Sequence, residues 1–158
     1  RLIIMITEKI AITRIAISIL LGGIIGIERY LQRHPAGVRT FMLICLGSTL
    51  ATLVSIWMCQ LDPNPVKGDP GRIAAQVVTG IGFLGAGLII KNRNEISGLT
   101  TAAGIFATAA IGIAVGAGML LTASVVTVAV FLILFSSFLF RDNDKTEPND
   151  NNPFNNNQ

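Results

Sequence analysis

The sequence has few charged residues and few aromatic ones. Charged side chains make up 13% of the 158 residues and aromatic side chains 6%, whereas about 25% of the residues in a soluble domain are charged. Hydrophobic residues make up 51%, and the mean hydropathy is +0.64. The sequence has too few polar residues to cover the surface of a soluble globular protein, and it is too apolar for a disordered chain. The composition therefore predicts a protein that lies in a lipid bilayer.

The residue patterns that carry catalysis are also missing. The sequence has no Ser/His/Asp or Cys/His set, no phosphate-binding P-loop and no HExxH motif. The lone His34 has no second ligand at metal-binding spacing, and Cys45 and Cys59 would lie about 21 Å apart along one helix, too far for a disulfide. The 12 Lys and Arg form no run of the kind that nucleic-acid binding needs. The sequence therefore predicts no enzyme activity, no cofactor, no metal site and no nucleic-acid partner.

Uncharged apolar runs are present instead, and each is long enough to cross a hydrocarbon core about 30 Å thick. One uncharged stretch, residues 96–140, would reach about twice that thickness as a single helix, so we expect it to turn back at Gly116, Ala117 and Gly118. Arg14 lies early in the first run and would have to snorkel to the headgroups. The sequence predicts an all-α membrane bundle of five transmembrane helices within a domain of residues 1–140. The expected spans are residues 10–27, 37–59, 71–90, 100–118 and 119–140.

The basic residues predict how the bundle is oriented. Seven Lys and Arg lie in the loops after the first and third spans and in the tail, and five lie on the opposite side. Cytoplasmic loops carry an excess of basic residues, so we expect the N-terminus outside and the C-terminus in the cytoplasm. The tail, residues 141–158, is rich in Asn and Asp and is expected to be disordered.

Small residues are expected to hold the helices together, because lipid provides no hydrophobic force between them. The first span has two glycines in GxxxG spacing, and Arg29 and Arg33 continue the same helical face. The fourth span has small residues at strict intervals of four. The third span has glycines around much of its inner half and is expected to be central, whereas the fifth has none and is expected to face lipid. The expected packing glycines are Gly22, Gly26, Gly80, Gly104, Gly112 and Gly116.

Polar residues gather at the outer edge of the third span. Asp69 is expected to cap the N-terminus of that helix, with Pro70 at its first position. Arg72 and Gln76 then share one helical face. Gln76 is the deepest strongly polar side chain of the sequence. We expect it to be paired inside the bundle, either in a hydrogen bond between helices or in a functional site.

The cytoplasmic edge carries a second polar group. Glu28 is expected to pair with Arg29 or Arg39 at the interface, where a solvated ion pair contributes about 0–1 kcal/mol. Ser97 or Thr100 is expected to cap the fourth span.

Several sequence blocks follow one another in a characteristic order. They are GGIIGIER (22–29), PAGVRT (35–40), DPGRIAAQVVTGIGFLGAG (69–87), SGLTTAA (97–103) and AAIGIAVGAG (109–118). Together they resemble the MgtC/SapB family of bacterial inner-membrane proteins over residues 15–140. The resemblance implies several membrane spans, an external N-terminus and a cytoplasmic C-terminus. The residues of these blocks that are functional candidates are Glu28, Arg29, Arg39, Asp69, Arg72, Gln76 and Thr100.

The resemblance also implies a role. Longer members of the family have a folded cytoplasmic domain after the last span, where this chain has an Asn-rich tail, so we expect the short, SapB-like form. Family members are associated with growth at low Mg²⁺ and with inhibition of the F-type ATP synthase. The resemblance therefore implies an inner-membrane protein that modulates Mg²⁺ or membrane-energy homeostasis through a membrane-protein partner, with the ATP synthase as one candidate.

The sequence is also compatible with two other hypotheses about function. One is a small ion transporter or channel with a path beside Gln76 and the glycines of the third and fourth spans. The other is a homo-oligomer that associates through the GxxxG face of the first span or the small residues of the fourth.

Overall fold

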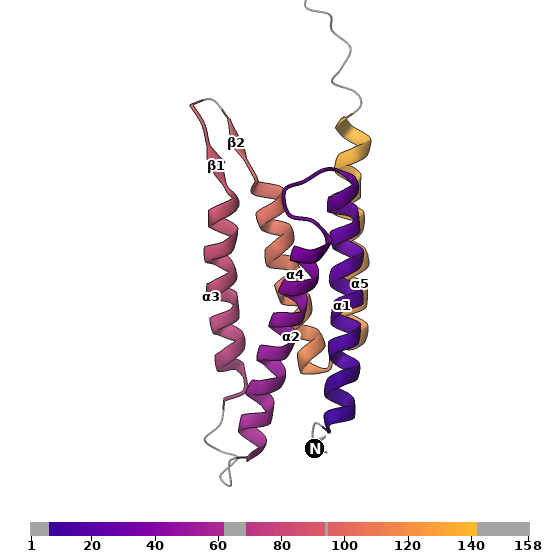
Figure 1. The fold of residues 1–158 in the computed structure, drawn as a ribbon, viewed down its shortest axis with the longest axis vertical. Helices are drawn as coiled ribbons and strands as arrows, with labels where there is room; N and C mark the ends of the chain where they lie inside the picture. Colours follow the sequence, from indigo (N-terminus) through magenta and orange to yellow (C-terminus); the bar gives the residue numbers. More distant parts are fainter. Residues whose placement is uncertain (1–6, 62–68, 94, 142–158) are drawn as a thin grey trace, which may run out of the picture.

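The computed structural model describes residues 7–61, 69–93 and 95–141, and side chains as far as residue 136. Within these ranges the chain forms five helices and a short two-stranded hairpin (Figure 1). The prediction of an all-α helical bundle is confirmed, although the hairpin was not predicted. The elements are α1 (Glu8–Leu31), α2 (Val38–Leu61), α3 (Gly71–Leu88), β1 (Ile90–Lys91), β2 (Ile96–Ser97), α4 (Leu99–Ala117) and α5 (Leu120–Arg141). Of the expected tail, residues 141–158, Arg141 is the last residue of α5, and residues 142–158 lie outside the described residues.

The helices alternate in direction, so the start of α1 and the end of α5 lie at opposite ends of the bundle (Figure 1). We call one end the hairpin end, because it carries residues 32–37 and the antiparallel strands β1 and β2. The opposite end carries the start of α1 and the turn between α4 and α5. Helices α1 to α4 are long and apolar enough to cross a membrane, and α5 is apolar over the part whose side chains are described, Leu120–Ser136.

Helices α2 and α4 form the centre of the bundle, and α2 packs on α1 through the predicted GxxxG pair. A Cβ atom added to Gly22 would lie 2.8 Å from the carbonyl oxygen of Phe41. One added to Gly26 would lie 2.6 Å from the Cα atom of Val38. Contacts this short leave no room for a side chain, so the two backbones meet because these residues are glycines.

The other side of α2 packs on α4 in the same way. A Cβ atom at Gly112 would lie 2.4 Å from the carbonyl oxygen of Cys45, and one at Gly116 would lie 2.6 Å from the Cβ atom of Thr52. The Thr49 hydroxyl donates a 2.8 Å hydrogen bond to the carbonyl oxygen of Gly112 across this contact. Both small-residue faces that the homo-oligomer hypothesis needed are therefore covered within the chain by α2.

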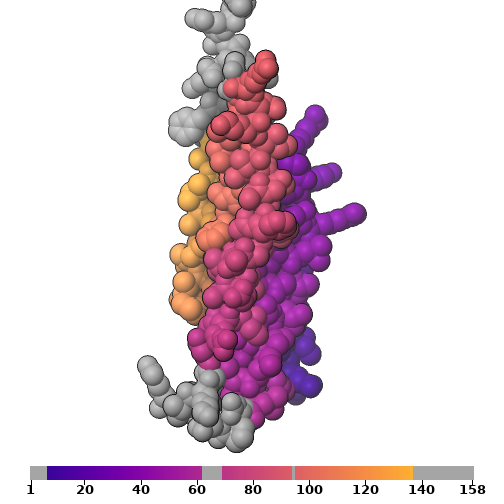
Figure 2. Space-filling model, turned by 90° about the vertical axis from the view of Figure 1, so that its left-hand side faces the viewer, coloured from indigo at the N-terminus to yellow at the C-terminus, as the bar shows by residue number. Residues whose placement is uncertain are grey.

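Helix α3 lies at the periphery, and the expectation that it is central was wrong. Of its residues only Ile81 and Gly85 are buried, and Figure 2 shows α3 lying at the surface that faces the viewer. A Cβ atom at Gly80 or Gly82 would meet nothing within 4 Å among the described residues. Glycine content does not identify the central helices, because α2 packs closely through small hydroxyl residues instead of glycines. Those buried in α2 are Ser48, Thr49, Thr52 and Ser55.

The uncharged stretch turns back at the expected glycines. Helix α4 ends at Ala117, and Gly118 adopts a left-handed conformation with φ 90°. Arg14 reaches this turn, where its Nη1 atom donates a 2.7 Å hydrogen bond to the carbonyl oxygen of Gly116. A cation is favourable at the C-terminal end of a helix, so Arg14 ties α1 to the turn.

Candidate functional site

Glu28 and Arg29 form an ion pair that is buried rather than solvated, which corrects the expectation from the sequence. Their side chains are 2% and 0% exposed. Arg29 Nη2 donates to Glu28 Oε1 at 2.6 Å, and Arg29 Nε donates to Oε2 of the same carboxylate. The pair is thus bidentate, the strongest arrangement open to these groups. Arg39 takes no part in it and is exposed.

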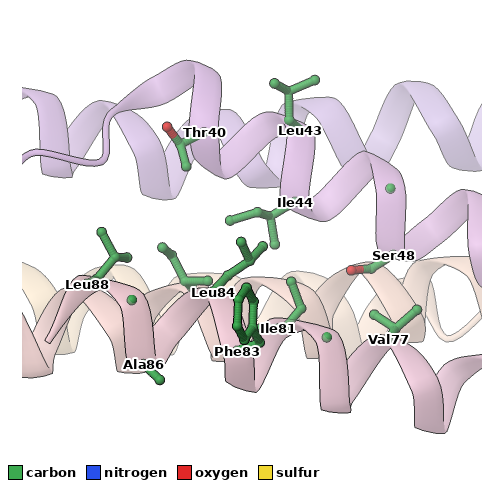
Figure 3. Close-up of a pocket in the computed structure, with 14 residues that line it drawn as sticks. Thr40, Leu43, Ile44, Ser48, Val77, Ile81, Phe83, Leu84, Ala86 and Leu88 are labelled. Carbon is green, nitrogen blue, oxygen red and sulfur yellow. The ribbon is translucent and has the colours of Figure 1, made fainter.

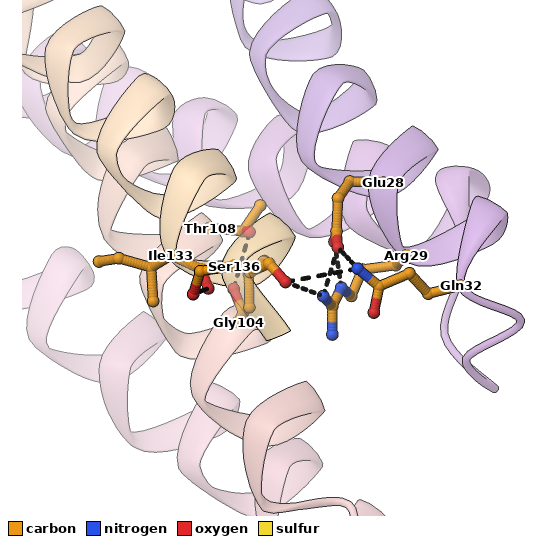
Figure 4. A network of polar contacts seen from close by, with 8 residues as sticks. Glu28, Arg29, Gln32, Gly104, Thr108, Ile133 and Ser136 are labelled. Atoms are coloured by element: carbon orange, nitrogen blue, oxygen red, sulfur yellow. Dashed lines mark hydrogen bonds and ion pairs between the residues drawn. The ribbon is translucent and has the colours of Figure 1, made fainter. Parts of the chain in front are cut away.

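The ion pair also binds α1 to α5 (Figure 4). Arg29 Nη2 donates a 3.2 Å hydrogen bond to the carbonyl oxygen of Leu134, and Gln32 Nε2 donates to the same oxygen at 3.4 Å. Gln32 also donates to the Glu28 carboxylate. Arg29 Nη1 is buried without a hydrogen-bond partner in the described part of the chain. We call Glu28, Arg29 and Gln32 the polar clamp.

One signal of this clamp is visible in the sequence. Arg29 continues the helical face of Gly22 and Gly26, and that face is covered, so Arg29 is covered as well. Arg33 does not continue it, because α1 ends at Leu31 and Arg33 has a positive φ of 58°. The burial of Glu28 has no signal in the sequence, because a charged residue at a helix end ordinarily reaches water.

The clamp stabilises helix packing and offers no open cation site. Both carboxylate oxygens of Glu28 accept hydrogen bonds from Arg29 or Gln32. Among the described residues, no three His, Cys, Asp or Glu side chains lie close enough to hold a metal ion. Removal of one partner from a buried ion pair leaves an uncompensated charge, so the two residues depend on each other.

The polar residues predicted at the start of α3 lie at the end of the bundle opposite the hairpin. Asp69 Oδ1 accepts a 2.8 Å hydrogen bond from the backbone N–H of Gly71, but the helix cap itself is Pro70, one residue later than expected. Proline fits there because its fixed φ suits the start of a helix. Ser55 Oγ donates a 2.8 Å hydrogen bond to the carbonyl oxygen of Pro70, which fixes the start of α3 against α2.

Three further candidates lie apart from the clamp. Arg72 and Gln76 are exposed on α3, so Gln76 is not paired inside the bundle as expected. The reason is the peripheral place of α3, which leaves this face of the helix uncovered. Thr100 is also exposed and does not cap α4, because Gly98 holds the cap position with φ 87° and no side-chain hydrogen bond.

A groove of about 920 Å³ separates α2 from α3. Thr40 and Leu88 lie at one end of it and Ser48 and Val77 at the other (Figure 3). The hydroxyls of Thr40 and Ser48 are the polar side-chain groups among residues that are otherwise apolar or glycine. No sequence signal marks this groove, because it forms between two helices that touch at few points.

A smaller hollow of about 500 Å³ lies at the hairpin end. It is lined by Tyr30, Gly37, Val38, Arg39 and Thr40. Since Thr40 lines both cavities, the hollow adjoins the end of the groove. Arg39, one of the predicted candidates, therefore lines the hollow beside this end of the groove.

Comparison with known proteins agrees with the resemblance seen in the sequence. The family model described as the MgtC family matches residues 15–141. YhiD of Escherichia coli K12, named as a candidate magnesium transporter, is 45% identical over 135 residues, which are 82% of this chain and 62% of YhiD. MgtC of Brucella abortus strain 2308 is 42% identical over 124 residues, 77% of this chain and 48% of that protein.

SapB of Bacillus subtilis strain 168 is 42% identical over 108 residues, 66% of this chain and 47% of SapB. The chain thus spans about half to three fifths of the length of these curated relatives. No solved structure matches it. The match of the family model over most of the chain, together with these identities, shows that the chain is a membrane protein that belongs to the MgtC family.

Proposed function

We propose that this protein modulates Mg²⁺ or membrane-energy homeostasis in the inner membrane through contact with another membrane protein. In this proposal the hairpin end of the bundle lies in the cytoplasm, and the end that carries the start of α1 faces outward. The observation that carries the proposal is the uncovered outer face of α3, which we define by Ala75, Thr79 and Gly82. All three residues are exposed.

The outer face of α3 has the chemistry of a helix contact. Its residues recur at four- and three-residue spacing, so they form one stripe along the helix. Gly82 has no neighbour within 4 Å of an added Cβ in the described chain, and the Thr79 hydroxyl already donates to the carbonyl oxygen of Ala75 at 3.2 Å. Small residues let a second helix approach closely in lipid. The glycines of α1 and α4 use this property within the bundle, whereas Gly82 leaves it open to another chain.

Ion conduction is the second candidate, and the name of the YhiD relative favours it. The contacts favour the first. In the described chain the groove beside α3 is lined mainly by apolar side chains, and both Glu28 oxygens are occupied. Mg²⁺ needs oxygen ligands and retains much of its water. Neither the apolar groove nor the occupied Glu28 carboxylate offers free oxygen ligands for such an ion.

Site-specific photo-cross-linking in native membranes tests the proposal. A photoreactive residue at Val78, which borders the outer face of α3, should cross-link to a membrane protein. The matched control is Val125 of α5, which is 61% exposed against 41% for Val78. Contact by random collision would favour the more exposed Val125, so a product at Val78 alone supports a specific partner. The ATP synthase, suggested by the family resemblance, is the first protein to look for in that product.

A second variant and a flux measurement complete the test. Gly82→Ile should abolish the product at Val78, because its side chain blocks close approach while it points away from the bundle. Equal products at both valines, or a product unchanged by Gly82→Ile, would contradict the proposal. Mg²⁺ flux through the purified protein in liposomes would favour the transporter instead.

A further inference from the structure

The groove between α2 and α3 matches one leaflet of a bilayer in length and chemistry. Thr40 and Ser48 mark its ends on α2, and Val77 and Leu88 mark them on α3. At 1.5 Å per residue these separations correspond to about 12 and 16 Å, close to half of a hydrocarbon core about 30 Å thick. Its volume of about 920 Å³ is at the upper end of the range of ligand pockets. Its long apolar shape fits a hydrocarbon chain.

The polar end of the groove has the opposite chemistry. The adjoining hollow brings together Arg39 and Thr40 of the first turn of α2 and Tyr30 near the end of α1. The first backbone N–H groups of a helix lack partners within the helix and carry positive partial charge. Arg39 is exposed. The ion pair that the described residues form joins Arg29 to Glu28 and does not include Arg39. This end therefore presents donors and positive charge.

Among the side chains that the structure describes, the remaining charges at the hairpin end are positive on balance. Arg33, Lys91 and Arg93 are exposed there, against Glu95. The Glu28 carboxylate is neutralised by Arg29. An anion that enters the hollow thus meets net positive surroundings. An apolar groove with a basic end is complementary to an amphiphile with an anionic head.

We propose that the groove and the hollow together bind one anionic phospholipid. An acyl chain lies along the groove, and the phosphate accepts hydrogen bonds from Arg39 and Thr40. Arginine suits this role because its planar guanidinium binds phosphate with two parallel N–H groups. The inference is independent of the partner proposed above, since it concerns the inner side of α3 and not its outer face.

Native mass spectrometry of the protein purified in detergent tests this proposal. The probe is an equimolar mixture of phosphatidylglycerol and phosphatidylcholine with the same acyl chains. We expect one phosphatidylglycerol to be retained per chain, in preference to phosphatidylcholine. Arg39→Gln should lower its affinity about tenfold, the effect of losing one charge-assisted hydrogen bond. Arg93→Gln removes the same charge at the same end, but outside both cavities, and should have no such effect.

A groove variant and a free-anion control separate the lipid from its headgroup. Gly80→Leu should also remove the bound lipid, because the new side chain fills the groove at a position that has open space around it. Inorganic phosphate should not displace the lipid if the acyl chain contributes to binding. Equal retention of both lipids, equal losses in Arg39→Gln and Arg93→Gln, unchanged binding by Gly80→Leu, or displacement by inorganic phosphate would each overturn the proposal.

Discussion

The Arg29 side chain is held on two sides, by the Glu28 carboxylate and by the backbone of α5. It is fully buried, it donates to both carboxylate oxygens of Glu28, of which Oε1 also accepts from Gln32, and it reaches the backbone of α5. A charge in such a place is retained only if its counter-charge is retained. Stability at this end of the bundle therefore depends on the pair and not on either residue alone.

Glu28→Leu should destabilise the protein by about 3–5 kcal/mol, because it leaves the buried Arg29 cation without a counter-charge. The double variant Glu28→Leu with Arg29→Met should recover most of this loss, since an apolar pair of similar volume needs no compensation. Unfolding of the purified protein in detergent, followed by circular dichroism, measures both. Equal losses in the single and double variants would show that the ion pair is not the cause.

The packing glycines give a second prediction at this scale. Gly112→Ala should cost about 1–3 kcal/mol, because its Cβ atom would lie 2.4 Å from a backbone oxygen of Cys45 that cannot move alone. Gly82→Ala should be neutral or stabilising by up to about 1 kcal/mol, because its Cβ atom meets open space and alanine favours a helix. The same unfolding measurement checks the difference, and a similar effect of both substitutions would contradict it.

Residue spacing predicted some of these contacts and not others. The four-residue intervals of Gly22 and Gly26, and of Gly112 and Gly116, place each pair on one face, and both faces meet α2. Gly80 was grouped with them but faces open space in the described chain. Spacing shows which residues share a face. It does not show whether that face is covered, because burial depends on the neighbouring helix.

At the scale of elements, hydrophobic runs predicted where the helices lie in the sequence, but not which helices pack against one another. An apolar run of helical length must form its hydrogen bonds internally in lipid, so its position follows from composition alone. Which helix is central depends on side-chain fit across several contacts. The place of α2 rests on buried hydroxyls such as Thr49, and these read in sequence as ordinary polar residues within an apolar run.

The turn between α4 and α5 carries a prediction of its own. Gly118→Ala should destabilise it in two ways, because φ is 90° there and the added Cβ atom would lie 2.6 Å from Arg14 Nη2. Arg14→Met removes the second cause but also loses the hydrogen bond to Gly116. The double variant should therefore lose less stability than the sum of the two single variants, as measured by unfolding in detergent. Strictly additive losses would argue against contact between these side chains.

At the scale of the whole molecule, five alternating helices place the start of α1 and the hairpin at opposite ends (Figure 1). The basic residues Arg33, Arg39, Lys91 and Arg93 lie at the hairpin end, and cytoplasmic loops carry such an excess. Both the proposed partner contact and the proposed lipid site depend on this arrangement, because it decides which leaflet and which proteins each face meets.

Single-cysteine labelling tests this orientation. In a variant with Cys45 and Cys59 replaced by serine, Lys9→Cys should react with a membrane-impermeant maleimide added to the outside of the inner membrane. Arg93→Cys should react only after the membrane is opened. Both positions are exposed, so access to the reagent decides the result. Labelling of both from the outside would contradict three crossings by α1, α2 and α3 between the two positions. Exchange of the two results would invert the orientation and place the lipid site in the outer leaflet.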